Sequence, residues 1–141
     1  MTTRQDDQRG SAAIEAAIGA AAFVLFLSLA ILGGRTAVAH QAVQAAATDA
    51  ARAASIARTS GEAASQARTA AAATLANQQL RCSDQTVTVD TSGFAIPVGQ
   101  PASVSATVTC DVIAADLGIP GRGSVRVEAT MNSPLDTYRG R

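Results

Sequence analysis

Residues 11–34 read SAAIEAAIGAAAFVLFLSLAILGG, and this stretch decides the architecture of the chain. It has 24 residues and a single charge, on Glu15. As an α-helix it would extend ~36 Å at ~1.5 Å per residue, and about 20 apolar residues are enough to cross the hydrocarbon core of a bilayer. The rest of the chain has too few large apolar residues to cover such a helix in a water-soluble core. The stretch therefore predicts one transmembrane helix.

The remainder of the chain can build only a small domain. Of the 141 residues, 48% are hydrophobic but only 3% are aromatic, and there is no Trp. Removing the first 34 residues leaves roughly 100, which suits one domain at most. Much of the apolar content is alanine, which buries little area per residue. We therefore expect this domain to need a covalent staple or a partner for stability.

Charge is balanced along the chain, with 11 basic and 11 acidic residues and a formal net charge of zero. All the basic residues are Arg, and no basic stripe with interleaved aromatic residues occurs, so nucleic acid is not an expected partner. Charges flank the apolar stretch on both sides, and those before it are mixed in sign. The positive-inside rule therefore assigns no orientation.

Alanine-rich sequence follows the membrane segment over residues 35–80. Alanine is the best helix former, so residues 36–58 and 62–80 predict two helices of a stalk or hairpin. Between them Ser60 is the expected N-cap, and Glu62 favours the first turn of the second helix. Ala63, Ala67, Ala70 and Leu75 are expected to face the first stalk helix. His40 is the only histidine, has no other metal ligand near it in sequence, and is expected to be exposed.

Alternating patterns replace the helical ones in a small strand-rich domain, residues 81–131. Residues 86–90, 103–110 and 124–129 alternate with the period of a half-buried strand. They predict a three-stranded antiparallel sheet whose valine face packs on the second helix. Residues 132–141 lack periodicity and are expected to be frayed. The predicted fold class is α+β: a long N-terminal transmembrane and stalk helix, a second Ala-rich helix and this sheet.

Two cysteines lie in the strand-rich part, Cys82 before the first strand and Cys110 at the end of the second. A tight hairpin is expected to hold these positions at opposite ends, but the long connection over residues 91–102 relaxes that constraint. A disulfide would add ~3–4 kcal/mol in the chain-entropy model and would indicate an oxidising compartment. Two free buried thiols and a thiol pair for a metal are the alternatives.

Glu15 is the informative residue of the membrane segment, because a carboxylate in a bilayer usually has a partner. A cut after Gly10 would give Ser11 a new amino group one helical turn from Glu15, and a neighbouring subunit's amine could then neutralise the carboxylate. The alternative is a Glu tolerated at the membrane interface. Ala12, Ala16 and Ala20 form a small-residue face that would let like helices pack closely, although simple alanine richness gives the same pattern.

The run RGSAAIE over residues 9–15, followed by an apolar helix, resembles the processing site of type IV prepilins. More narrowly, it resembles the TadE-like pseudopilins of tight-adherence (Flp) pili. The resemblance implies cleavage by a prepilin peptidase after Gly10, on the cytoplasmic side, with residues 1–10 as the leader peptide and Glu15 fifth in the mature chain. Major Flp pilins are shorter and have an aromatic residue where this chain has Ala16. That departure indicates a minor component.

Partners and location follow from the same resemblance. It implies a single-pass protein of the cytoplasmic (inner) membrane, with its C-terminal part extracytoplasmic, that can be built into a cell-surface pilus. The implied partners are the membrane, the prepilin peptidase, other pilins or pseudopilins and the assembly machinery. No cofactor, metal or small-molecule substrate is expected. No catalytic residues are expected either, since no catalytic triad, phosphate-binding loop or metal cluster occurs.

A competing interpretation rests on the tripeptide Ala37-Val38-Ala39 just after the apolar run. Signal peptidase recognises such an A-x-A site. A cut there, or an uncleaved anchor, would give a secreted or membrane-tethered binding module beginning at His40 or Met1. The length of the apolar run and the charge on Glu15 disfavour a signal peptide, whose apolar region is ~7–15 residues.

Overall fold

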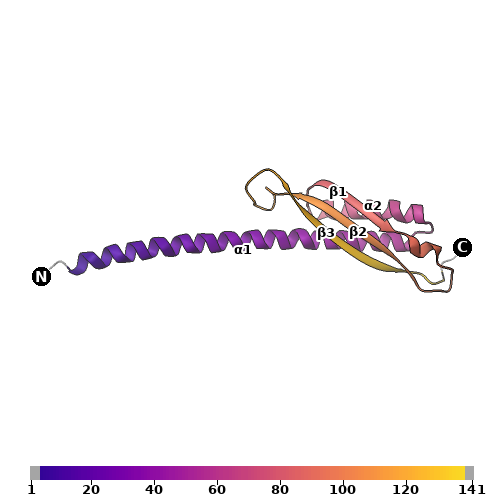
Figure 1. The fold of residues 1–141 in the computed structure, drawn as a ribbon, viewed down its shortest axis with the longest axis horizontal. Coiled ribbons are helices and arrows are strands. Elements are labelled where there is room, and N and C mark those ends of the chain that lie inside the picture. Colours follow the sequence, from indigo (N-terminus) through magenta and orange to yellow (C-terminus); the bar gives the residue numbers. More distant parts are fainter. Residues whose placement is uncertain (1–3, 139–141) are drawn as a thin grey trace. The chain divides into compact units, whose positions relative to one another are not determined.

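The computed structural model describes the backbone of residues 4–138 and the side chains from residue 12 to 138 (Figure 1). Its class is α+β, as predicted. The elements in chain order are α1 (Arg4–Ile56), α2 (Ser60–Asn77), β1 (Cys82–Asp90), the short 3-10 helix η1 (Ser92–Ala95), β2 (Ala102–Ile113) and β3 (Ser124–Leu135). The chain divides into two compact units, Met1–Gly34 and Arg35–Arg141. Helix α1 contributes residues to both units, and each unit is described by itself.

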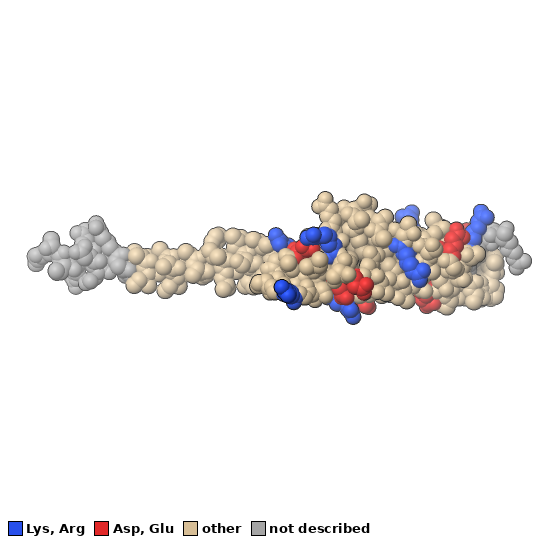
Figure 2. Space-filling model, turned by 90° about the horizontal axis from the view of Figure 1, so that it is seen from above, with Lys and Arg blue, Asp and Glu red and all other residues tan. Residues whose placement is uncertain are grey.

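The first unit is helical throughout its described part and has no core of its own. Large apolar side chains stand exposed along it, among them Ile18 at 66% and Phe26 at 69%. Its described surface carries no charge on the face shown in Figure 2, whereas the second unit carries charges of both signs. Ser28 suits this apolar helix because its hydroxyl donates to the Val24 carbonyl at 2.8 Å. A helix that is apolar on all sides is suited to burial in lipid or among other helices.

Alanines hold the two helices of the second unit together. The C-terminal half of α1 buries a stripe at helical spacing, Ala39, Val43, Ala46, Ala47, Ala50, Ala51 and Ala54. Helix α2 buries Ala63, Ala67, Ala71 and Leu75. Three of the four predicted residues are confirmed; Ala71 takes the place of Ala70 because strict spacing by four keeps the seam on one side of this helix.

The start of α2 corrects the predicted cap. Thr59, in an extended conformation, is the N-cap, and its hydroxyl accepts a hydrogen bond from the Glu62 amide at 3.2 Å. Ser60 is instead the first helical residue. Glu62 stands in the first turn as predicted, and its carboxylate accepts from the Arg58 amide at 3.3 Å. Thr-x-x-Glu is a capping-box pattern, in which the glutamate also satisfies an amide at the helix start.

The three strands form an antiparallel sheet in the order β1-β2-β3. In the central strand β2, Val104, Ala106, Val108, Cys110 and Val112 are buried on one side and the residues between them are more open. These buried residues join the alanines of α1 and α2 in one core, so the sheet packs on both helices and not on α2 alone. The segments 35–80 and 81–131, distinguished above by composition, thus share a single core.

The third strand is longer than its sequence pattern predicted. It continues to Leu135, which is buried, so residues 132–135 are strand and not frayed tail. The sequence does not predict this continuation, because a proline such as Pro134 normally argues against a strand. Pro134 lies in an edge strand, opposite Ser103, where proline's missing amide costs no ladder hydrogen bond. Residues 139–141 of the expected tail lie outside the described part.

A disulfide joins Cys82 to Cys110, with the two Cα atoms 5.3 Å apart. The expectation that a tight hairpin would separate them was wrong, because the start of one strand and the end of the next antiparallel strand meet at the same end. Cys82 lies opposite Val112, and an irregularity between Cys82 and Asp84 brings Gln85 opposite Cys110. The alternatives of free thiols and a thiol pair for a metal are excluded by this bond.

Candidate functional site

The predicted processing and assembly residues all lie on α1, which begins at Arg4. Gly10 and Ser11 are therefore within helical backbone, and the Ser11 side chain lies outside the described ones. Glu15 is exposed, and no hydrogen bond or ion pair joins it to any described side chain. It remains the sole charge between residues 11 and 34. Among residues 12–34 the carboxylate therefore has no counter-charge.

Small residues leave one side of this helix smooth. Ala12, Ala16 and Ala20 are all exposed. A Cβ added at Gly19 would meet nothing within 4 Å. A smooth helix surface lets another helix approach closely in lipid. Whether these alanines pack against a partner stays a prediction.

One helix in the described part is long and apolar enough to cross a membrane. The candidate span begins at Ala12, near the N-terminus, and its most apolar 18-residue window has a mean hydropathy of 2.4 and no buried residues. A secretion signal near the N-terminus has the same properties. The helix therefore suits either a membrane anchor or a secretion signal.

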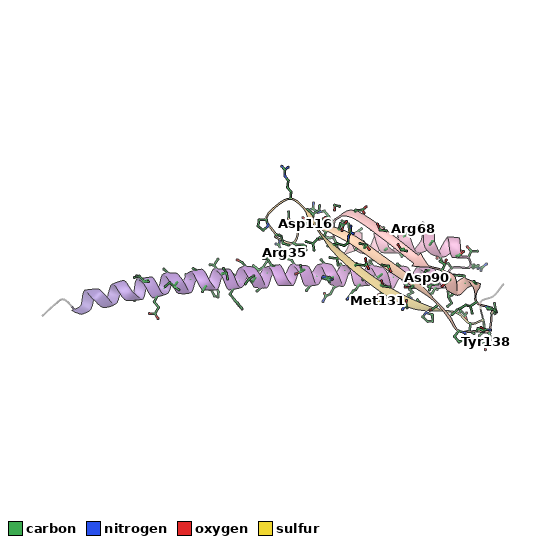
Figure 3. All side chains as sticks on the ribbon, viewed as in Figure 1. Arg35, Arg68, Asp90, Asp116, Met131 and Tyr138 are labelled. Carbon is green, nitrogen blue, oxygen red and sulfur yellow. A yellow bond between two sulfur atoms is a disulfide. The ribbon has the colours of Figure 1, made fainter. Side chains whose placement is uncertain are left out.

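Polar contacts at the start of the second unit were not foreseen from the sequence. Arg35 Nη1 donates to the backbone oxygen of Asp116 at 3.4 Å, and Figure 3 shows these two residues near one another. The Asp116 carboxylate pairs with Arg81 at 2.6 Å. These residues are separated by 81 and 35 positions in sequence, so no local pattern could reveal the cluster. It connects the loop between β2 and β3, residues 114–123, to Arg35 at the beginning of this unit.

The outer face of the sheet is polar and carries a two-point ion pair. Arg126 donates from Nε to Asp111 Oδ1 at 2.9 Å and from Nη2 to Oδ2 at 3.0 Å. These hydrogen bonds lower the pKa of Asp111 and raise that of Arg126. Near the end of β1, the Ser92 amide donates to Asp90 at 2.9 Å and lowers the pKa of that carboxyl. The same face also carries hydroxyl groups. The hydroxyl oxygens of Thr107 and Thr130 are hydrogen-bonded at 2.8 Å. This is the pattern of a solvated sheet face.

A hollow of about 560 Å³ lies where α1 ends beside the end of β3. Its lining is Ser55, Ile56, Ala57, Arg58, Pro134, Leu135 and Asp136. These residues contain no nucleophile paired with a base. Among the side chains described from residue 12 to 138, no three His, Cys, Asp or Glu residues gather as a metal site would require. His40 is exposed as predicted.

Comparison with known proteins finds a similarity in the N-terminal segment. No curated protein and no solved structure matches the chain. Residues 10–52 match the family model described as TadE-like protein. The match begins at Gly10 and includes Glu15, the apolar helix and the first part of the alanine-rich stretch. Residues 10–52 of this chain are therefore similar to the TadE-like protein family.

Proposed function

We propose that the chain is a minor pseudopilin of a tight-adherence (Flp) pilus system. In this proposal a prepilin peptidase cuts after Gly10, and residues 11–34 then anchor the protein in the cytoplasmic membrane. The second unit stands on the extracytoplasmic side and takes part in building or capping the pilus. The TadE-like family is one of pilus components and is not known for enzymes, which agrees with a structural role.

The observation that carries the proposal is a lone carboxylate on the exposed apolar part of α1, residues 12–31. Glu15 is exposed and has no partner among the described side chains. A buried or lipid-facing carboxylate is costly without a counter-charge. After a cut at Gly10 the amino group of Ser11 would be a cation at the membrane. An amine from a neighbouring subunit would neutralise Glu15 and fix the register between adjacent helices.

The second unit supports an anchor rather than a removed signal. It begins at Arg35, before the alternative cleavage point at Ala39. Ala39 is 1% exposed and belongs to the core, and Arg35 bonds to Asp116. A cut after Ala39 would remove both contributions from the folded unit. The residues used in folding therefore favour retention of the whole of α1 from Ser11 onward.

The absence of lysine makes the mature N-terminus chemically unique. All the basic residues are Arg, so the α-amino group is the chain's only primary amine. Labelling the membrane-extracted protein with an amine-reactive reagent, followed by peptide mass analysis, should place the label on Ser11. A label on His40 or Met1 would instead support the tethered or secreted binding module.

A zero-length carbodiimide reaction tests the pairing itself. In assembled membranes it should join the Ser11 amine of one chain to Glu15 of its neighbour, giving a cross-linked dimer. Glu15→Gln should abolish this product and impair assembly. Glu128→Gln, a matched change on the exposed sheet face, should leave both unaltered. Undiminished cross-linking and assembly in Glu15→Gln would contradict the role of Glu15.

A further inference from the structure

The loop between β2 and β3, residues 114–123, is held firmly at its base. Ala114 is 8% exposed and Leu117 is 3% exposed, so both are buried against the second unit. Between them, Asp116 accepts a hydrogen bond from Arg35 through its backbone oxygen and pairs with Arg81 through its carboxylate. The loop therefore has a defined position next to Arg35, the first residue after the apolar segment.

The outer part of the same loop is exposed and partly apolar. Ile119 is 38% exposed, and Pro120, Gly121 and Arg122 are exposed beside it. Gly118 and Gly121 have φ angles of 80° and 130°, which residues other than glycine rarely adopt. Gly118 lets the chain turn between Leu117, which is buried, and Ile119, which is exposed. An exposed isoleucine is ordinary alone, but here it lies next to a proline and an arginine.

The position of the loop next to Arg35 suggests that the membrane surface is the partner of its exposed side chains. In the proposed topology residues 11–34 occupy the bilayer, so Arg35 lies at the membrane surface. The hydrogen bond from Arg35 then brings the loop close to that surface. Three arginines, Arg35, Arg81 and Arg122, are associated with this loop against one carboxylate, that of Asp116. Exposed apolar groups with arginines are suited to an interface rich in anionic headgroups.

We propose that residues 114–123 form a membrane-contacting loop. Ile119 and Pro120 enter the interfacial layer of the bilayer, and Arg122 binds anionic lipid headgroups together with Arg35. The inference rests on the proposed anchoring by residues 11–34. It adds a second membrane contact, made by the folded unit, which would restrict how that unit tilts on its anchor.

The chain has no Trp, so single Trp substitutions give unambiguous depth reporters. The full chain is reconstituted in vesicles of phosphatidylcholine with phosphatidylglycerol, with some of the lipid brominated on its acyl chains. Trp fluorescence in Ile119→Trp should be blue-shifted and quenched by the brominated lipid. Val98→Trp is the matched control. Val98 is 51% exposed and lies just before the start of β2, whereas the loop of residues 114–123 follows the end of that strand. It should show neither effect.

A third reporter separates failure of the loop from failure of the anchor. The Phe26→Trp substitution places the reporter within the apolar segment, where it should be quenched strongly. Quenching in the Phe26→Trp variant without quenching in the Ile119→Trp variant would overturn the loop proposal and leave the anchor standing. Absence of quenching in both variants would overturn the anchor as well.

The headgroup contact has its own test. In Ile119→Trp, quenching should increase several-fold when phosphatidylglycerol is added to pure phosphatidylcholine vesicles, and Arg122→Gln should reduce that increase. The same quenching in both lipid mixtures would show that the arginines do not recognise anionic lipid, and would refute that part of the proposal.

Discussion

Cys82 and Cys110 are joined by a disulfide that ties the start of β1 to the end of β2 across a sequence separation of 28 residues. The core around it consists mainly of alanine and valine. Such a core gains little free energy per residue from burial. The bond therefore supplies a substantial share of the stability of the second unit.

Replacing both cysteines by serine should lower the free energy of unfolding by about 3–4 kcal/mol, because the unfolded chain regains loop entropy. Urea unfolding of the full chain in detergent, followed by circular dichroism, measures this loss. The native chain treated with reductant should approach the variant. Complete alkylation of the native protein without reductant would contradict the disulfide.

The stability of the second unit should fall in acid. The pKa values of Asp111 and Asp90 are lowered by hydrogen bonds from Arg126 and Ser92. A carboxyl with a lowered folded-state pKa stabilises the fold above its unfolded value, about 3.9, and loses that effect as the pH falls through the folded value. Unfolding midpoints should therefore be flat from about pH 5 to 8 and decline below about pH 4.

Asp111→Asn provides the control for that decline. It removes the ionised partner of Arg126, so it should be less stable than the native chain at neutral pH. The difference should shrink as the pH falls through the lowered pKa of Asp111, because the native carboxyl then becomes protonated too. A difference independent of pH would show that the ion pair does not cause the acid sensitivity.

Thr59→Ala should destabilise the second unit by about 1 kcal/mol, because the Glu62 amide at the start of α2 loses the hydroxyl that accepts its hydrogen bond. Ser60→Ala tests the neighbouring hydroxyl, which does not serve as the cap, and should change stability by only a few tenths of that amount. Thermal unfolding of the two variants distinguishes the two assignments. A larger loss of stability in Ser60→Ala than in Thr59→Ala would show that Ser60 is the N-cap, as predicted from the sequence.

Gly93→Ala should be destabilising by more than about 1 kcal/mol, since the added methyl group would collide with the backbone carbonyl of Ser103. Gly61→Ala is the contrasting change, because its methyl group would meet nothing within 4 Å. In the first turn of α2 it should be neutral or stabilising by up to ~1 kcal/mol. Urea midpoints of the two variants should therefore move in opposite directions, or only the first should move.

Ala16→Leu should reduce co-assembly if the face formed by Ala12, Ala16 and Ala20 packs against another helix. Ala22→Leu adds the same bulk about 120° away around the helix, at about 100° per residue, and should be tolerated. Co-purification of tagged and untagged chains from membranes compares the two. Equal behaviour would indicate that this face has no helix partner.

Composition and periodicity could predict the fold class, because strand alternation and alanine-rich helices are local signals. The long apolar helix and the carboxylate at Glu15 are local signals too. The strand end at Leu135 was missed because Pro134 normally ends a strand unless it lies at an edge. The cap at Thr59 was misplaced by one residue, since adjacent hydroxyls look alike in sequence. The contact between Arg35 and Asp116 was beyond reach, because it depends on chain folding over 81 positions.

The bond between Cys82 and Cys110 also sets an order of events. In the reducing cytoplasm the two thiols stay apart, and a core of small side chains alone holds the second unit only weakly. In the proposed topology the newly made second unit is therefore only weakly folded while it is translocated across the membrane. Oxidation on the far side then locks β1 to β2. In that topology the second unit gains its full stability only on the extracytoplasmic side of the membrane, where the disulfide forms.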